Sequence, residues 1–117
     1  MVLADTSVWI EHLRRGQPSL AKLLAEGVVL MHPFVYGEIA CGNLHDRSSM
    51  LSNLDALPSA KPASHVEVMH LLETNKLSGR GLGWIDMHLL ASALVSKCLL
   101  WTLDRRLAQA AAELKLC

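Results

Sequence analysis

Three short apolar runs, separated by segments with helical periodicity, restrict the fold of this sequence more than any other feature. The runs cover residues 2–4, 28–31 and 98–103. Consecutive apolar residues are typical of strands that are buried on both faces, and such strands occur in parallel sheets covered by helices. The alternation of strands with helices therefore predicts an α/β domain with a central parallel sheet and helices on both of its faces.

Glycine and proline residues divide the rest of the chain into helices. The predicted helices begin near Thr6, Pro18, Pro33, Asp46, Ser64, Ile85 and Arg105. Residues 58–62 form a break with room for a short edge strand. Residues 78–83 read Ser-Gly-Arg-Gly-Leu-Gly, which predicts a flexible or tightly turning loop between two helices. Because the sequence contains no repeat, low-complexity tract or linker, we predict one domain over residues 1–117.

The composition indicates a folded protein without an overall attraction for nucleic acid. The 117 residues are 51% hydrophobic and 19% charged, which argues against intrinsic disorder. Lysine and arginine together number 11, as do aspartate and glutamate, so any contact with RNA must come from local patches. Three cysteines without a Cys-x-x-Cys pair suit a reducing cytoplasm. Without a signal-peptide pattern or an apolar stretch near the roughly 20 residues that cross a bilayer, we expect a soluble cytoplasmic protein.

Four acidic residues lie where a parallel sheet is expected to form a ligand site. Asp5 follows the first strand and Asp104 follows the last, and the carboxyl ends of parallel strands meet at one edge of a sheet. If these strands are neighbours, the two carboxylates converge. Asp86 lies at the start of an apolar helix, where the helix dipole favours negative charge, and Glu38 lies on another apolar helix.

Each of these acids also has a structural explanation. Asp5, Asp86 and Asp104 can act as helix N-caps, and Glu38 can be solvated. As a set, however, four like charges in one cleft repel and are costly to desolvate unless a cation neutralises them or some are protonated. An all-oxygen ligand set favours Mg²⁺ or Mn²⁺ over zinc. Such an ion can orient a water and stabilise charge on a phosphate, so we predict phosphodiester hydrolysis.

Polar residues near the acids extend this hypothesis. The hydroxyls of Thr6, Ser7 and Thr102 can orient the carboxylates or a bound water, although helix capping or strand packing explains them equally well. Arg80, in the glycine loop, is our candidate for substrate contact, because arginine binds phosphate through two parallel hydrogen bonds. The tryptophans are expected to fill the core rather than to stack on bases: Trp9, Trp84 and Trp101.

The sequence around each acid resembles that of a known family. Asp5 lies in Leu-Ala-Asp-Thr-Ser-Val-Trp-Ile, Glu38 in Tyr-Gly-Glu-Ile, Asp86 in Trp-Ile-Asp-Met-His-Leu-Leu-Ala-Ser-Ala, and Asp104 in Leu-Trp-Thr-Leu-Asp-Arg-Arg-Leu. With these motifs in this order, the chain resembles a PIN-domain protein, and specifically the VapC-like toxins of bacterial type II toxin-antitoxin systems. The resemblance extends over essentially the whole chain, and the metal-binding acids of the family correspond to these four residues with none missing.

The resemblance implies properties that the residues alone do not indicate. It implies a central parallel sheet of about five strands flanked by helices. It implies an Mg²⁺- or Mn²⁺-dependent endoribonuclease that arrests growth by cutting a structured RNA, often a transfer RNA or a ribosomal RNA. It also implies a homodimer, a hetero-oligomer with a small VapB-like antitoxin that covers the active-site groove, and binding of promoter DNA only through that antitoxin.

Two other classes of function compete with this one. A catalytically silent PIN-like module would act only by binding its partner, and the retention of all four acids argues against it. A phosphate-receiving signalling domain is also a small α/β sheet with an acidic pocket, but it needs a lysine after the last strand, and residues 98–104 contain none. A metal-dependent thermal shift would distinguish the nuclease from the silent module.

Overall fold

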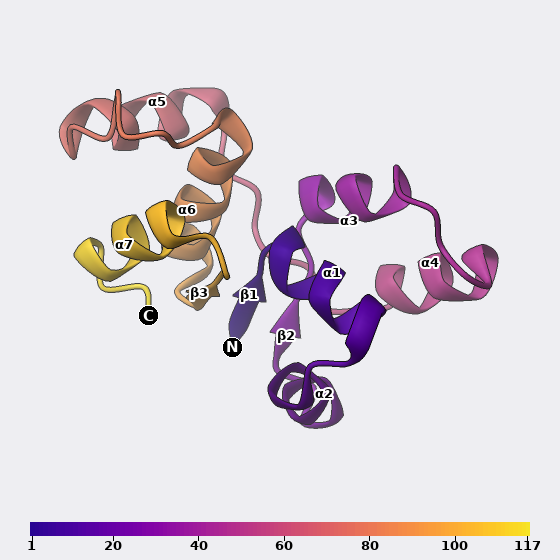
Figure 1. Ribbon diagram of the computed structural model, residues 1–117. Helices are drawn as coiled ribbons and strands as arrows, with labels where there is room; N and C mark the ends of the chain where they lie inside the picture. The colour runs from indigo at the N-terminus through magenta and orange to yellow at the C-terminus, as the bar shows by residue number, and fades with distance from the viewer.

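The computed structural model describes all 117 residues and shows a small parallel sheet flanked by helices (Figure 1). The elements in chain order are β1 (Val2–Ala4), α1 (Thr6–Arg15), α2 (Pro18–Ala25), β2 (Val29–Leu30), α3 (Pro33–Ala40), α4 (Arg47–Asp55), α5 (His65–Thr74), α6 (Trp84–Ser96), β3 (Leu99–Trp101) and α7 (Arg105–Glu113). In Figure 1, α1 to α4 lie to the right of β1, and α5 to α7 lie to its left. The predicted α/β fold is confirmed.

The first strand is the centre of the sheet, with β2 and β3 paired to it in parallel on either side. In this register Leu3 lies opposite Leu30 of β2 and Leu100 of β3. Leu3 is fully buried, as the continuous apolar run predicts. Because β1 and β3 are neighbours and parallel, the residues that follow them leave the sheet at the same edge.

The sheet has three strands, whereas the resemblance implies about five. Two further segments touch its edges without forming strands. Met31, just after β2, forms a parallel bridge with Ser59, within the break where the sequence predicts an edge strand. At the other edge, the amide of Leu100 donates to the carbonyl of Leu116 (2.7 Å). The ladder at Ser59 stays short because Pro58 has no amide hydrogen to donate.

The hydrophobic core surrounds α6, which packs against both α5 and β3. Seven consecutive residues of α6, from Met87 to Ala93, are buried, as expected for a helix that is apolar on all sides. The one hydroxyl among them, on Ser92, donates to the carbonyl of Lys61 (2.6 Å). None of the helices has both the length and the hydropathy that a membrane crossing requires. The burial of α6 fixes the position of its first turn, where Asp86 lies.

Candidate active site

Asp5 lies at the junction between β1 and α1. Its amide donates to the carbonyl of Trp101 in β3 (2.9 Å), and its Oδ1 accepts the amide of Ser7 (2.8 Å). Asp5 is therefore the N-cap of α1, and it is only 6% exposed. An ionised carboxylate has about four lone-pair positions, so this capping bond uses only part of its capacity.

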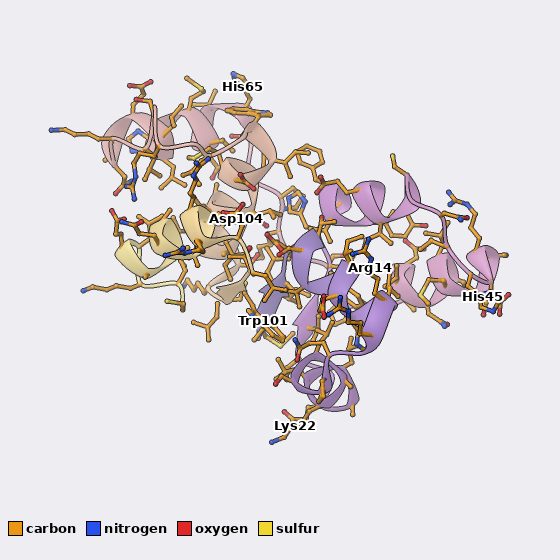
Figure 2. All side chains as sticks on the ribbon, in the orientation of Figure 1. Arg14, Lys22, His45, His65, Trp101 and Asp104 are labelled. Carbon is orange, nitrogen blue, oxygen red and sulfur yellow. The ribbon has the colours of Figure 1, made fainter.

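Asp104 caps α7 in a similar way. Its Oδ1 accepts the amides of Arg106 (2.9 Å) and Leu107 (3.1 Å), and its side chain is exposed. Its Oδ2 takes no part in these bonds and remains available to a ligand. Figure 2 shows Asp104 in the middle of the molecule, between the helices on the two sides of the strands. Both structural explanations offered for Asp5 and Asp104 thus hold, and neither excludes a role in a ligand site.

The other two acids come from α6 and α3. Asp86 is the third residue of α6, and its Oδ2 accepts the amide of Gly83 (2.9 Å), which closes the first turn of the helix. Glu38 lies in the second half of α3 with an exposed side chain, and its Oε1 accepts the hydroxyl of Thr6 (2.6 Å). Asp86 therefore leaves Oδ1 unused, and Glu38 leaves Oε2 unused.

The four carboxylates act on one another electrostatically. The pKa of Asp86 is raised above its ordinary value, chiefly because burial disfavours the charged form. The hydrogen bond from Gly83 opposes this effect, whereas the negative charges of Asp104, Asp5 and Glu38 raise the pKa of Asp86 further. Asp86 thus lies within electrostatic reach of the other three acids that the sequence singles out.

Hydroxyl groups connect these acids into a network. The hydroxyl of Thr102 donates to Oδ2 of Asp5 (2.6 Å), and the hydroxyl of Ser7 donates to Oδ1 of the same residue. Ser7 Oγ also accepts the amide of Leu103 (3.0 Å), and Thr102 Oγ1 accepts the amide of Asp104 (3.0 Å). Together with the bond from Thr6 to Glu38, these contacts fix the orientation of two of the carboxylates.

The chemistry of this cluster fits a hard divalent cation. All of its donors are carboxylate or hydroxyl oxygens, the ligands that Mg²⁺ and Mn²⁺ prefer. Because the charges of the other acids raise the pKa of Asp86, a positive charge here would relieve repulsion. No three of the acidic, histidine or cysteine side chains are spaced closely enough to hold one ion in this structure, so binding an ion requires side-chain rotation.

Cationic side chains lie on the glycine loop and on α7, the helix that begins directly after Asp104. Arg80 is partly buried and forms a two-bond ion pair with Glu113 of α7, one of whose distances is 3.0 Å. Arg105, Arg106 and Gln109 line a cavity of about 550 Å³ beside Asp104. Neither of these two arginines forms an ion pair. Contact between Arg80 and a substrate requires its ion pair to open, whereas Arg105 and Arg106 are free to bind an anion.

The amino-acid sequence alone did not predict the row of aromatic and imidazole rings near the acids. Trp9 is buried as expected, but Trp84 is 41% exposed and packs against the rings of His65 and His88. The expectation that Trp84 fills the core is therefore wrong. Trp84 lies two residues before Asp86, at the first residue of an apolar helix, and this position could have indicated that its ring is partly exposed.

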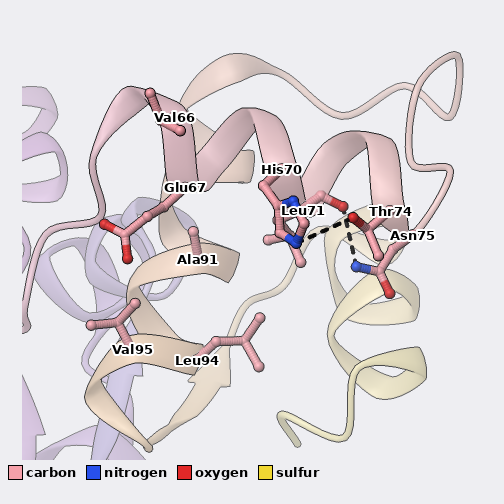
Figure 3. A pocket seen from close by; sticks show the side chains of 9 residues that line it. All are labelled: Val66, Glu67, His70, Leu71, Thr74, Asn75, Ala91, Leu94 and Val95. Atoms are coloured by element: carbon pink, nitrogen blue, oxygen red, sulfur yellow. Dashed lines mark hydrogen bonds between the residues drawn. The ribbon is translucent and has the colours of Figure 1, made fainter.

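A large hollow elsewhere on the molecule lies apart from these acids. It has a volume of about 550 Å³ and lies between α5 and α6. Figure 3 shows its lining, which is mostly aliphatic and includes Val66, Leu94 and Val95. None of the four clustered acids contributes to it. Its lining includes Glu67 and His70, but no three acidic, histidine or cysteine side chains there are grouped closely enough to hold a metal ion.

Comparisons with known proteins agree with this geometry. The model of the PIN domain family matches residues 2–113. Ribonuclease VapC32 of Mycobacterium tuberculosis, in strain CDC 1551 / Oshkosh and in strain ATCC 25618 / H37Rv, is 45% identical over 114 residues, which cover 97% of this chain and 92% of the relative. The chain belongs to the PIN-domain family, and within it the chain is a VapC-like toxin of the ribonuclease class.

Proposed function

We propose that the protein is an Mg²⁺- or Mn²⁺-dependent endoribonuclease and the toxin of a bacterial type II toxin-antitoxin system. It hydrolyses phosphodiester bonds of a structured RNA, such as a transfer RNA or a ribosomal RNA, through Asp5, Glu38, Asp86 and Asp104. The observation that supports this most directly is the parallel pairing of β1 with β3, which places Asp5 and Asp104 after neighbouring strands at one edge of the sheet. A cluster of this kind is typical of a site built for a cation and a phosphate.

The residues of the cluster have different tasks in this proposal. Asp5 is held from both sides by the hydroxyls of Ser7 and Thr102, so it enters the reaction in a fixed orientation. Glu38 is exposed and is oriented by a single hydrogen bond, from Thr6. A divalent ion, when bound, supplies positive charge that offsets the acids and the scissile phosphate.

Asp86 also has an oxygen that is free to contact a bound ion. Its Oδ1 makes no hydrogen bond within the protein, since Gly83 binds Oδ2. Burial and the charges of the other acids raise the pKa of Asp86 in the ion-free protein, and a divalent cation would favour its charged form. We therefore assign to Asp86 a share in holding the ion, which when bound would lower the pKa of the attacking water.

Membership of the VapC-like toxins supports a proposal for the partners. We propose a homodimer that forms a hetero-oligomer with a VapB-like antitoxin in the cytoplasm. The antitoxin covers the groove that contains the four acids, and the complex binds promoter DNA only through the antitoxin. Arg80, once released from Glu113, contributes a phosphate contact to the RNA.

Cleavage of end-labelled bacterial total RNA by antitoxin-free protein tests this function. We expect discrete fragments with Mg²⁺ or Mn²⁺, none with a chelator, and none with Asp5→Asn. Asp55→Asn is the matched control, because it removes the same charge from an exposed position on α4. Absence of cleavage in every divalent ion, against several RNAs, would instead indicate a silent binding module.

A further inference from the structure

Five rings form a continuous row beside the acidic cluster. The ring centroids of His32 and Phe34 lie 5.1 Å apart, and those of Phe34 and His88 lie 4.8 Å apart. The row continues from His88 to Trp84 at 4.8 Å and from Trp84 to His65 at 5.2 Å. It therefore connects the start of α3 to the starts of α6 and α5.

The row adjoins two of the four acids. Phe34 precedes Glu38 by four residues on α3, so both side chains lie on the same side of that helix. Trp84 is the first residue of α6 and Asp86 is the third, so both lie in the first turn of that helix, although their side chains project from different faces. A nucleotide on this row would therefore lie next to one whose phosphate faces the acids.

The exposed fractions of the rings indicate a partly open surface rather than a part of the core. His88 in the middle is 8% exposed, whereas Phe34 is 38% and Trp84 is 41% exposed. His88 meets both outer rings edge to face, at interplanar angles of 65° and 83°. Such contacts stabilise aromatic pairs and fix the planes of the rings. Two large π-systems are thereby held rigidly while part of their surface stays open to solvent.

We propose that Phe34 and Trp84 are stacking platforms for unpaired bases of the RNA whose phosphate is held at the acids. The inference rests on the proposed nuclease function and adds a substrate preference, because only unpaired bases can be stacked in this way. RNA is favoured over a protein segment because the surface is aromatic and imidazole rather than aliphatic, and because it adjoins a phosphate site. A chain with 11 basic and 11 acidic residues also needs a source of affinity other than net charge, and stacking provides it.

Binding of a fluorescein-labelled oligoadenylate of twelve nucleotides tests the proposal. The measurement uses protein with Asp86→Asn, so that the RNA stays intact. We expect the added change Trp84→Leu, which keeps apolar bulk but removes the π-face, to weaken binding roughly 5- to 100-fold. Trp84→Phe keeps a ring and should stay within about threefold of the parent. Phe34→Leu and Phe34→Tyr form a second pair with the same expectation.

Two controls separate stacking from other effects. Ile10→Ala removes an exposed apolar side chain from α1 and should leave binding unchanged. An oligomer of the same length with abasic sugars should bind the Trp84→Leu and parent proteins equally, because it offers no base to stack. Circular dichroism and thermal melting confirm that each variant folds like its parent.

Two results would overturn the proposal. The first is equal affinity of the leucine and phenylalanine variants, with their folds intact. The second is protection of Trp84 from acrylamide quenching in the protein alone, which would mean that a second copy already covers the rings. Neither result depends on catalysis, so the two proposals can fail separately. If the protein without the Asp86→Asn change cuts RNA and Trp84→Leu binds normally, the stacking proposal is wrong and the proposed nuclease function is unaffected. If the variants differ as expected but no RNA is cut, the nuclease function fails and the binding surface stands.

Discussion

Asp86 combines burial with proximity to three other negative charges, so its ionisation opposes folding. A carboxyl group whose pKa is raised in the folded state contributes stability that is present below its ordinary pKa and lost as the pH rises through the raised pKa. We expect Asp86→Asn to raise the free energy of unfolding in urea at pH 7.5, with little gain near pH 3.5. Cleavage should fall by orders of magnitude, because the ion loses one of its carboxylate ligands.

The matched control for Asp86→Asn is again Asp55→Asn. Asp55 is exposed, so its replacement should change stability by less than about 0.5 kcal/mol at either pH and leave cleavage intact. Loss of stability in Asp86→Asn at pH 7.5 would show that the carboxylate supports the fold, through the bond from Gly83, more than it strains it.

His32 should make the stability of the fold depend on pH in the opposite direction to Asp86. It is 1% exposed, and burial, followed by the charge of His88, lowers its pKa from 6.5 to about 4. Stability from such a group is complete above pH 6.5 and is lost as the pH falls toward 4, by up to about 3 kcal/mol. His32→Asn removes this titration, while asparagine still caps α3 as the Nδ1 of His32 does for the amide of Phe34 (2.9 Å).

The measurement for His32 is the difference in unfolding free energy between pH 7.5 and pH 4.5. We expect a larger fall in the parent than in His32→Asn. The contribution of Asp86 is common to both proteins and cancels in the comparison. Equal falls in the two proteins would mean that His32 is protonated in the folded state at pH 4.5, despite its burial.

At the scale of secondary-structure elements, local signals predict most of the fold. Apolar runs, glycines and prolines locate all three strands and the start of each helix, because they act through neighbouring residues. The strand-end acids Asp5 and Asp104 follow from topology alone. What the sequence does not reveal depends on distant partners: the edge contact of Leu116, the ion pair of Arg80 and the rings around Trp84 each join separate elements.

The glycine loop before α6 offers a prediction about such a contact. Gly79 and Gly81 both have positive φ values, of 73° and 79°, so alanine at either position should cost about 1 kcal/mol. A Cβ on Gly79 meets nothing within 4 Å, whereas one on Gly81 would lie 2.7 Å from the guanidinium of Arg106. Because this guanidinium ends a flexible side chain, we expect it to move, and the two variants should have similar melting temperatures.

Only Gly81→Ala should therefore affect RNA binding, through the displaced Arg106. We expect its affinity for the oligoadenylate to fall severalfold, with a smaller dependence on salt, while Gly79→Ala binds like the parent. A much lower melting temperature for Gly81→Ala than for Gly79→Ala would contradict this view, because it would show that Arg106 is fixed in place.

Arg80 and Glu113 join the same loop to α7, and their ion pair is partly exposed. An ion pair of this kind contributes about 0 to 1 kcal/mol, so neither Arg80→Ala nor Glu113→Gln should change stability much. If Arg80 contacts phosphate, Arg80→Ala raises the KM for RNA about tenfold, and Glu113→Gln, which frees the guanidinium, lowers it or leaves it unchanged. An increase in KM for both variants would show that the ion pair itself positions the loop.

At the scale of the whole molecule, the acidic cluster joins the two groups of helices across the sheet. Asp5 and Glu38 come from the α1 and α3 side, and Asp86 and Asp104 come from the α6 and α7 side. Repulsion among them therefore acts between the two halves of the domain. A cation that binds all four would hold the halves together, so metal binding should be visible in the stability of the entire fold.

Thermal unfolding of the protein should therefore shift upward with Mg²⁺ or Mn²⁺. At a concentration one hundred times the dissociation constant, binding adds about 2.7 kcal/mol, which for a domain of this size is roughly 10 °C in Tm. KCl at equal ionic strength should give a much smaller shift, since screening cannot replace coordination. The metal-dependent shift should vanish in Asp5→Asn and persist in Asp55→Asn. A shift of the same size in both variants would place the ion elsewhere on the surface and separate the acidic cluster from the stability of the fold.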